Sequence, residues 1–350
     1  MNHRRIIDQM ALLFRAAAVL AVTFIFPLAV MADEVVIVNG DRITGQVVRH
    51  AGGPLKLKTT YAGTLQIEWD QVQQLILDEP VKVILNDERV LEVDDFSWDG
   101  GQYILHPVSQ SSEVAVAEGQ LKVIVPDPWE LGLGHKFTGR VEIAVENEKG
   151  NSEKNEFDLD FMFNNRWNKN NLQVQGELEY DTTRGFTSSD NWSVMGNLDH
   201  TFSHKWYYVG AVMFKSDRFA DLKLRSLFGG GIGYRFFDSK PLSLRFEAGP
   251  YYLDDDFKDQ PDGSYWGPAW YLDYDQMVWQ SRLQLYHRQT GFVAADSTDK
   301  FLWRAWTGVR VPLIAGLVGS VEYEIDYDSE PAVEAETTDS TFKLKLGYKW

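Results

Sequence analysis

Hydrophobic and polar residues alternate along most of the second half of the chain. In the closing stretch "TFKLKLGYKW" the apolar residues occupy every second position, with lysine or glycine between them. This two-residue period is typical of a β-strand with one apolar and one polar face. Twelve such segments, each of about 10–14 residues as in barrel strands, begin near Lys136, Glu156, Asn171, Asn191, Trp206, Ser226, Leu242, Gly267, Ser281, Phe301, Leu317 and Thr341.

The stretches that connect these segments alternate in length. Longer ones such as "GFTSSD" and "DSEPAVEAETTD" follow short ones such as "NKN" and "LIA", without exception along the series. Barrels of the bacterial outer membrane have long loops outside the cell and tight turns in the periplasm. The sequence therefore predicts an all-β protein with a transmembrane antiparallel β-barrel of about twelve strands, formed by residues 129–350. Its C-terminus is expected on the periplasmic side.

The apolar residues of the last segment are expected to have a second role. Aromatic and apolar residues at the last position and at alternate positions before it resemble the C-terminal signature of bacterial outer-membrane barrels. Tryptophan stands at the last position, where phenylalanine is more usual in that signature. We therefore expect an assembly signal, recognised by the barrel-assembly machinery, at Phe342, Leu344, Leu346, Tyr348 and Trp350.

The polar faces of the same segments carry charges of both signs. On the last two strands, the phase of the pattern predicts that carboxylates and lysines face each other in the lumen: Glu322, Glu324, Asp326, Lys343 and Lys345. Further inward-facing cations are expected at Arg235, Arg245, Arg282, Arg288, Arg304, Arg310 and Lys349. The near-balance of signs is compatible both with ion pairs in an occluded lumen and with a conducting pore.

The stretch "VPDPWELGLG" separates these long segments from a front part with shorter strands and more frequent turns. Residues 33–128 are predicted to form a small all-β domain in the periplasm, in which residues 35–80 and 82–128 are weak repeats of each other. Chance similarity between two alternating β-segments is the alternative explanation. Before this domain, residues 1–32 have a basic start, an apolar core and small residues near the end. They are typical of a secretory signal peptide, and the apolar run is short for a membrane anchor.

Charge and cysteine content exclude several classes of function. The formal net charge is −17, which disfavours a nucleic-acid partner. The chain contains no cysteine, so it has no disulfide framework, thiolate metal site or cysteine nucleophile. The acidic stretch from Asp254 to Gly263 lacks the spacing of a calcium loop and is more typical of a solvated surface loop. No metal and no cofactor are expected.

The stretches "VNGDRITGQV", "LKLKTTYAGTLQIEW", "GNSEKNEFDLDFMF" and "LFGGGIGYRF" together resemble the domain-of-unknown-function family 481. Members of that family are described as salt-induced outer-membrane proteins. The resemblance implies a β-rich front domain followed by a barrel, located in the cell outer membrane. The family has no established chemistry, so the resemblance assigns no catalytic or binding residue.

Outer-membrane enzymes exist, and a lipid hydrolase would need a serine beside an oriented histidine. The candidates are His200, Ser203, His204 and His287, which are better explained as turn and surface residues. We expect a non-enzymatic protein that is either structural in the envelope or a narrow channel for small solutes. A lipid-active enzyme, or a scaffold that binds a periplasmic protein partner, is the alternative. Outer-membrane lipid and lipopolysaccharide are the other expected partners.

Overall fold

The computed structural model describes most of the chain after the predicted signal peptide, which lies outside the described residues except for Ala32. The described ranges are 32–49, 54–99, 101–109, 112–117, 120–148, 154–239, 241–279, 281–295, 299–331 and 336–350. The chain divides into two compact units, with the main boundary between Val125 and Pro126.

The first unit is a nine-stranded antiparallel sheet. Its strands are β1 (Asp33–Ile37), β2 (Arg42–Val47), β3 (Leu55–Thr59), β4 (Gly63–Ile67), β5 (Val72–Leu85), β6 (Val90–Asp99), β7 (Gln102–Pro107), β8 (Val114–Ala117) and β9 (Leu121–Ile124). The order is β4-β3-β2-β1-β5-β6-β7-β8, and β9 pairs with β5. A short 3₁₀ turn, Trp69–Gln71, precedes β5.

The two halves of this sheet have the same strand order, because β5 belongs to both. In one half the order is β4-β3-β2-β1-β5, where the first part of β5 pairs with β1. In the other half the order is β8-β7-β6-β5-β9, where the second part of β5 pairs with both β6 and β9. The register of β5 with β6 shifts between Ile76 and Val81. Pro80 lies in that interval, where its missing N–H removes no ladder bond. Leu57 in β3 and Leu105 in β7 are both completely buried in the core of this unit.

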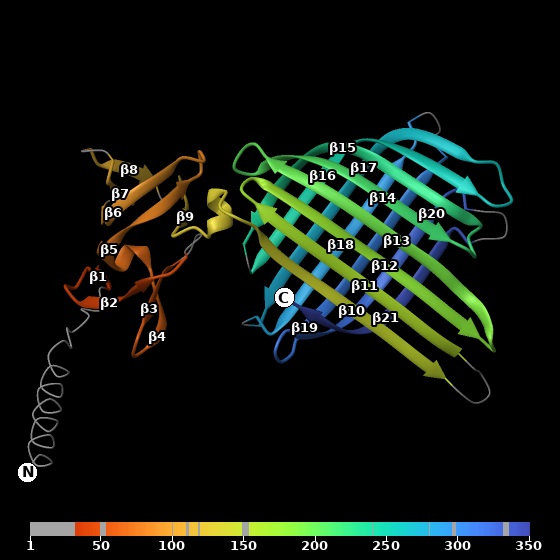
Figure 1. The fold of residues 1–350 in the computed structure, drawn as a ribbon, viewed down its shortest axis with the longest axis horizontal. Coiled ribbons are helices and arrows are strands. Elements are labelled where there is room, and N and C mark those ends of the chain that lie inside the picture. The colour runs from red at the N-terminus through yellow and green to blue at the C-terminus, as the bar shows by residue number, and fades with distance from the viewer. Residues whose placement is uncertain are drawn as a thin grey trace, which may run out of the picture. The chain divides into compact units, whose positions relative to one another are not determined.

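The second unit is the barrel (Figure 1). Its strands are β10 (Lys136–Glu148), β11 (Lys154–Trp167), β12 (Asn170–Thr183), β13 (Phe186–Thr201), β14 (Trp206–Asp217), β15 (Leu222–Asp238), β16 (Leu242–Phe257), β17 (Gly263–Val278), β18 (Leu283–Val293), β19 (Phe301–Pro312), β20 (Leu317–Asp328) and β21 (Thr338–Lys349). Each strand pairs antiparallel with the next, and β21 closes on β10. The predicted fold class, with twelve barrel strands after a separate sheet, is confirmed.

The outer face of the barrel is apolar along its strands. On β14, Tyr208, Val212 and Phe214 are exposed, whereas Val209 and Ala211 between them point inward and are buried. Large exposed hydrophobic side chains occur in the same way on every barrel strand that the structure describes except β18. A continuous apolar outer surface is unfavourable in water and is the lipid-facing surface of a closed barrel. The unit is therefore a transmembrane β-barrel of the outer-membrane type.

The predicted alternation of loop lengths is wrong at one hairpin and weak at another. Most of "GFTSSD" lies in β13, and β12 connects to β13 through only Arg184 and Gly185. Both residues have positive φ (51° and 79°), as a two-residue hairpin turn requires. The connection 218–221 is no longer than the turns 202–205 and 279–282 at the other end. Serine and aspartate, which were interpreted as loop residues, pair in the ladder because these strands continue past the apolar zone.

The contact between the first and last strands is shorter than the other barrel pairings. Residues 140–143 of β10 pair with residues 346–349 of β21, whereas β10 pairs with β11 along its whole length. The backbones of Gly139 and Trp350 extend this seam through two hydrogen bonds, of 3.2 and 3.1 Å. The Trp350 ring covers Gly139 so closely that a Cβ there would lie 2.3 Å from a ring carbon. The seam therefore depends on a side-chain-free position opposite the last residue.

We predict that Gly139→Ala destabilises the barrel by roughly 1–3 kcal/mol, because the added methyl group displaces the Trp350 ring. The unfolding midpoint in urea, followed by heat-modifiable migration on gels, measures this. Gly210→Ala is the matched control, since a Cβ at Gly210 meets nothing within 4 Å. Equal midpoints for the two variants would show that the ring does not constrain the seam.

Candidate functional site

The lumen of the barrel is the candidate functional site, because the inward faces of its strands carry most of the polar side chains. Glu322, Glu324, Lys343 and Lys345, which the sequence predicts to line the lumen, lie inside and are only 6–7% exposed. Asp326 also points inward and is half-buried. The structure therefore brings all five predicted residues into one interior.

Lys345 and Lys343 each contact several carboxylates. The Lys345 Nζ donates to Glu322 Oε1 at 2.5 Å and also pairs with Asp160 on β11. The Lys343 Nζ lies 3.6 Å from Glu324 Oε2. It also lies 3.2 Å from Glu179 Oε2 and 3.4 Å from Asp158 Oδ1. Each lysine thus connects β20 to β11 or β12, across the β10–β21 seam.

One predicted lumen cation is placed wrongly by the sequence. Arg282 is exposed and lies in the turn between β17 and β18, where its backbone N–H donates to the backbone carbonyl of Trp279 at 3.2 Å. The strand begins at Leu283 rather than at the predicted Ser281, so the phase of this segment does not extend to Arg282. The turn ends the alternation and leaves the guanidinium outside.

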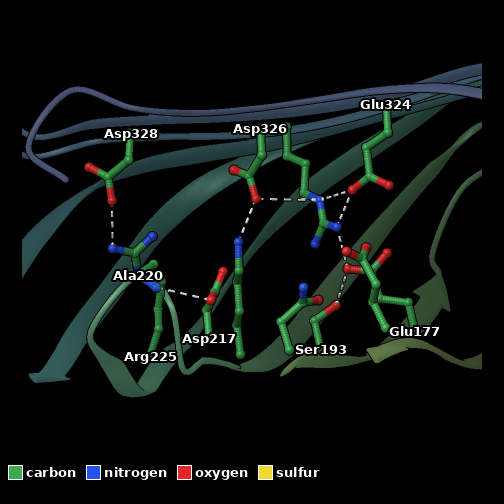
Figure 2. Close-up of polar contacts among 12 residues, drawn as sticks. Glu177, Ser193, Asp217, Ala220, Arg225, Glu324, Asp326 and Asp328 are labelled. Carbon is green, nitrogen blue, oxygen red and sulfur yellow. Dashed lines mark hydrogen bonds and ion pairs between the residues drawn. The ribbon is translucent and has the colours of Figure 1, made fainter. Parts of the chain in front are cut away.

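Toward the loop end, side chains from opposite walls of the barrel contact each other. Lys215 on β14 pairs with Asp326 on β20, six strands away in the ring of twelve. Arg225 on β15 donates to Asp328 Oδ2 at 2.8 Å, five strands away. Figure 2 shows Asp328 pointing from one wall toward Arg225 on the facing wall. These pairs cross the lumen, and we call them the loop-end layer.

A further crossing lies next to this layer. Arg304 on β19 pairs with Glu324 on the neighbouring strand and with Glu177 on β12, five strands away around the ring. Glu177 also accepts a hydrogen bond from Ser193 Oγ at 2.9 Å. Figure 2 shows Glu324 and Glu177 on facing sides of this contact. One guanidinium therefore joins two distant walls.

A second layer lies toward the tight turns, and we call it the turn-end layer. Arg310, which is completely buried, donates to both carboxylate oxygens of Glu142 at 3.0 and 3.1 Å. Glu142 also accepts from Ser320 Oγ at 2.8 Å and lies 2.5 Å from Arg140 Nε. The Arg310 guanidinium stacks on the Tyr286 ring at 4.3 Å. This side of the layer joins β19, β20 and β18 to β10.

The other side of the turn-end layer is centred on Arg245 of β16. Its guanidinium donates to Gln173 Oε1 at 2.6 Å, which lies on β12, four strands away. It also lies 3.2 Å from Asp273 Oδ2. Tyr207 donates to Glu247 Oε1 at 2.8 Å in the same region. The layer is a network of charge-assisted hydrogen bonds, in which each group has several partners.

The free space inside the barrel includes three cavities. One of about 220 Å³ opens at the turn end and is lined by residues such as Arg166, Asp238 and Lys349. One of about 140 Å³ lies between the two layers. A third, of about 60 Å³, lies at the loop end around Asp217 and Glu336. Side chains of the barrel wall itself separate these spaces.

Several lumen residues were missed by the sequence analysis. Lys215 and Asp273 lie on inward faces within the predicted segments, and extending the strand phase into the predicted connections would have found Arg225 and Asp255. Lys300 could not have been found in this way, because it lies in the connection between β18 and β19. It is almost completely buried and donates to Asp328 at 2.9 and 3.2 Å.

The five residues of the predicted assembly signal all point outward, four of them on β21 and Trp350 directly after it. Their side chains are between 48% and 66% exposed, and they alternate with the inward Lys343 and Lys345. The backbone of the first four pairs with β20, and the backbone of Leu346, Tyr348 and Trp350 also bonds to residues 139–143. The structure places them on the lipid-facing surface beside the seam, and their recognition during assembly stays a prediction.

Two of the histidines considered for hydrolysis contact an asparagine amide oxygen or a threonine hydroxyl. His200 Nδ1 lies 2.9 Å from Asn170 Oδ1, and His287 Nδ1 lies 2.7 Å from Thr307 Oγ1. Ser203 and His204 lie in the turn 202–205. Within the described ranges, no cluster of three or more His, Asp and Glu side chains is arranged to hold a metal ion. The same ranges contain no helix that is long and apolar enough to cross a membrane.

Comparisons with known proteins found a relative by sequence and several similar solved structures. The uncharacterized protein YdiY of Escherichia coli (strain K12) is 23% identical over 241 residues, which is 67% of this chain and 90% of that protein. Among solved structures, the NanC porin is 9% identical with a TM-score of 0.40, covering 61% of this chain and 100% of that one. The channel DcaP of Acinetobacter baumannii is 10% identical with a TM-score of 0.30, covering 77% and 94%. These structural similarities are too low to bear on function.

A family model provides the assignment. The model described as "Protein of unknown function, DUF481" matches residues 141–350, which include nearly the whole barrel. This range is more than half of the chain. The chain therefore belongs to the DUF481 family of proteins of unknown function.

Proposed function

We propose that this outer-membrane barrel is a non-enzymatic envelope protein with a closed lumen, which holds its N-terminal sheet domain at the periplasmic face. The observation that carries this proposal is the contact between opposite walls, above all Lys215 with Asp326 and Arg304 with Glu177. The role is structural, and the outer face contacts lipid and lipopolysaccharide. The N-terminal domain is then available to a periplasmic protein partner.

Closure follows from the energetics of the crossing pairs. A hydrated solute that passes through the lumen must separate pairs such as Arg310 with Glu142, both of which are almost completely buried. Removing one partner of a buried pair costs about 3–5 kcal/mol, because the remaining charge is left uncompensated. A barrier of that size reduces passage by a factor of roughly 10²–10⁴. Two such layers in series make a conducting ground state unfavourable.

The tight turns support the proposed orientation. The connections 168–169, 202–205, 239–241, 279–282 and 313–316 all lie at the barrel end where β10 begins and β21 ends. At the other end only 184–185 and 218–221 are as short. Short turns in outer-membrane barrels face the periplasm. The chain would then enter the barrel at Lys136 from the periplasmic side, so that the preceding domain lies in the same compartment.

A narrow channel for small polar solutes is the second candidate. It is favoured by the cavities along the lumen and by the fact that the layers between them are side chains rather than a folded plug. A rearrangement of the paired side chains would connect these spaces. Conductance separates the two candidates. Hydrolysis of phospholipid by the purified protein would contradict both.

The first test is the conductance of the purified protein in planar bilayers. We predict that the wild-type barrel shows no stable channel, and that a fourfold variant with Lys215→Ala, Asp326→Ala, Glu142→Ala and Arg310→Ala conducts, because both layers have lost a crossing pair. The variant Lys223→Ala with Asp256→Ala is the matched control, since that pair is largely exposed and crosses nothing. Stable, reproducible channels in the wild-type protein would favour the channel candidate and contradict closure.

The second test concerns orientation and uses the absence of natural cysteines. We predict that Asp259→Cys, in the connection 258–262, is labelled by an impermeant maleimide on intact cells. Asp238 is exposed at the end of β15, which lies at the other end of the barrel, and Asp238→Cys should be labelled only after the outer membrane is permeabilised. Labelling of Asp238→Cys on intact cells would invert the proposed orientation.

A further inference from the structure

The central cavity of the barrel has one apolar wall. It measures about 140 Å³ and lies between the loop-end and turn-end layers. The apolar wall is formed by β14–β18, with side chains that include Ala211, Leu227, Tyr251, Ala269 and Phe292. Three methionines, Met162, Met195 and Met213, also line it. Methionine adapts its shape to its neighbours and contacts aromatic rings favourably.

The opposite wall is charged, but its charges are already neutralised within the protein. Arg304 is paired with Glu177 and Glu324, and Lys345 is paired with Asp160 and Glu322. At the layers, Lys215 is paired with Asp326, Arg225 with Asp255, Arg288 with Asp273, and Glu247 with Arg245. A charged ligand would enter without a free counter-charge. The wall therefore selects against ions and accepts a neutral molecule.

Three of the described residues that line this cavity have a buried polar atom without a hydrogen bond, and two of them, Arg140 and Asp160, have an ion-pair partner instead. The third is Tyr271. The Tyr271 hydroxyl has no hydrogen-bond partner, although its side chain is only 3% exposed. Buried hydroxyl groups in proteins are nearly always hydrogen-bonded, and one without a partner is a candidate for an unseen ligand or water. Its ring is held by the Arg245 guanidinium, 5.2 Å from the ring centre. The free hydroxyl is therefore fixed at the edge of an apolar space.

We propose that the central cavity binds a small uncharged aromatic molecule with one oxygen, of the phenol class, and that the Tyr271 hydroxyl donates a hydrogen bond to that oxygen. The size fits, because an apolar cavity of about 150 Å³ holds one benzene ring. The methionines and Phe292 contact the ring, while the paired charges exclude carboxylates and amines of the same size. Binding at this site does not depend on conduction, so a negative binding result would not contradict the proposed closed lumen.

The test is equilibrium dialysis of the full-length protein in detergent with p-cresol, toluene and benzoate as probes. We expect saturable binding of one p-cresol per barrel, weaker binding of toluene and no binding of benzoate at neutral pH. Tyr271→Phe should weaken p-cresol by about two- to tenfold, the range for one neutral hydrogen bond, and leave toluene unchanged. The melting temperature without ligand should not fall, because the hydroxyl has no partner to lose.

Ala269→Leu provides the matched control, because it fills the cavity from the apolar wall and should abolish binding of p-cresol and toluene together. Heat-modifiable migration checks that this variant folds. Unchanged p-cresol binding in Ala269→Leu would place the molecule in the micelle or on the surface and overturn the proposal. Benzoate binding as tight as that of p-cresol would overturn the neutral site, as would the absence of saturable binding. Binding of p-cresol that Tyr271→Phe does not alter would overturn the proposed hydrogen bond from the Tyr271 hydroxyl to the ligand.

Discussion

The pairing of charges across the lumen is the interaction on which the barrel's interior depends. Lipid surrounds the outside of the strands, so every charged group of the membrane-spanning part has to find its partner within the ring. Lys215 with Asp326 and Arg304 with Glu177 satisfy this requirement between walls that are five or six strands apart. At the turn end the contacts span fewer strands: Arg310 reaches Glu142 three strands away, and Arg245 reaches Gln173 four strands away. In the part of the chain that the structure describes, the interior is thereby filled by side chains of the barrel wall.

The same pairing determines what the spaces between the layers can accept. Because the lysines and arginines are neutralised by neighbouring carboxylates, the central cavity presents an apolar wall and no free charge. Its unpaired polar group is the Tyr271 hydroxyl. The cavity at the turn end is different, since Arg166, Asp238 and Lys349 make its rim polar and open to solvent. One barrel thus combines a wet entrance with a small and largely apolar chamber.

The sequence predicted the barrel well because strand periodicity and membrane thickness constrain it strongly. The phase that places Leu344 outward also places Lys343 and Lys345 inward, and the structure agrees at each position. The phase of the alternation, however, specifies only whether a side chain faces the lumen or the lipid. Its position along the barrel axis, and the side chains that it faces across the lumen, depend on the shear of the closed barrel. The sequence therefore identified Lys343 and Glu324 as neighbours on adjacent strands, but it could not have paired Lys215 with Asp326.

Segments outside the apolar zone were the least predictable. Serine and aspartate near Phe186 were assigned to a loop by composition, although the ladder with β12 continues through them. Arg282 was assigned to a strand that begins one residue later, and Lys300 is buried although it lies in a connection. In each case tertiary pairing decided the outcome. The local amino-acid composition does not determine that pairing.

The most direct measurement of the central claim is a double-mutant cycle on the pair that spans the barrel. The unfolding free energies of Lys215→Ala, Asp326→Ala and the double variant, compared with the wild type, isolate the interaction between the two side chains. We predict a coupling of about 0.5–3 kcal/mol, the range for residues in direct contact. Strict additivity, with no coupling, would show that the two walls do not meet and would contradict a lumen closed by pairs between opposite strands.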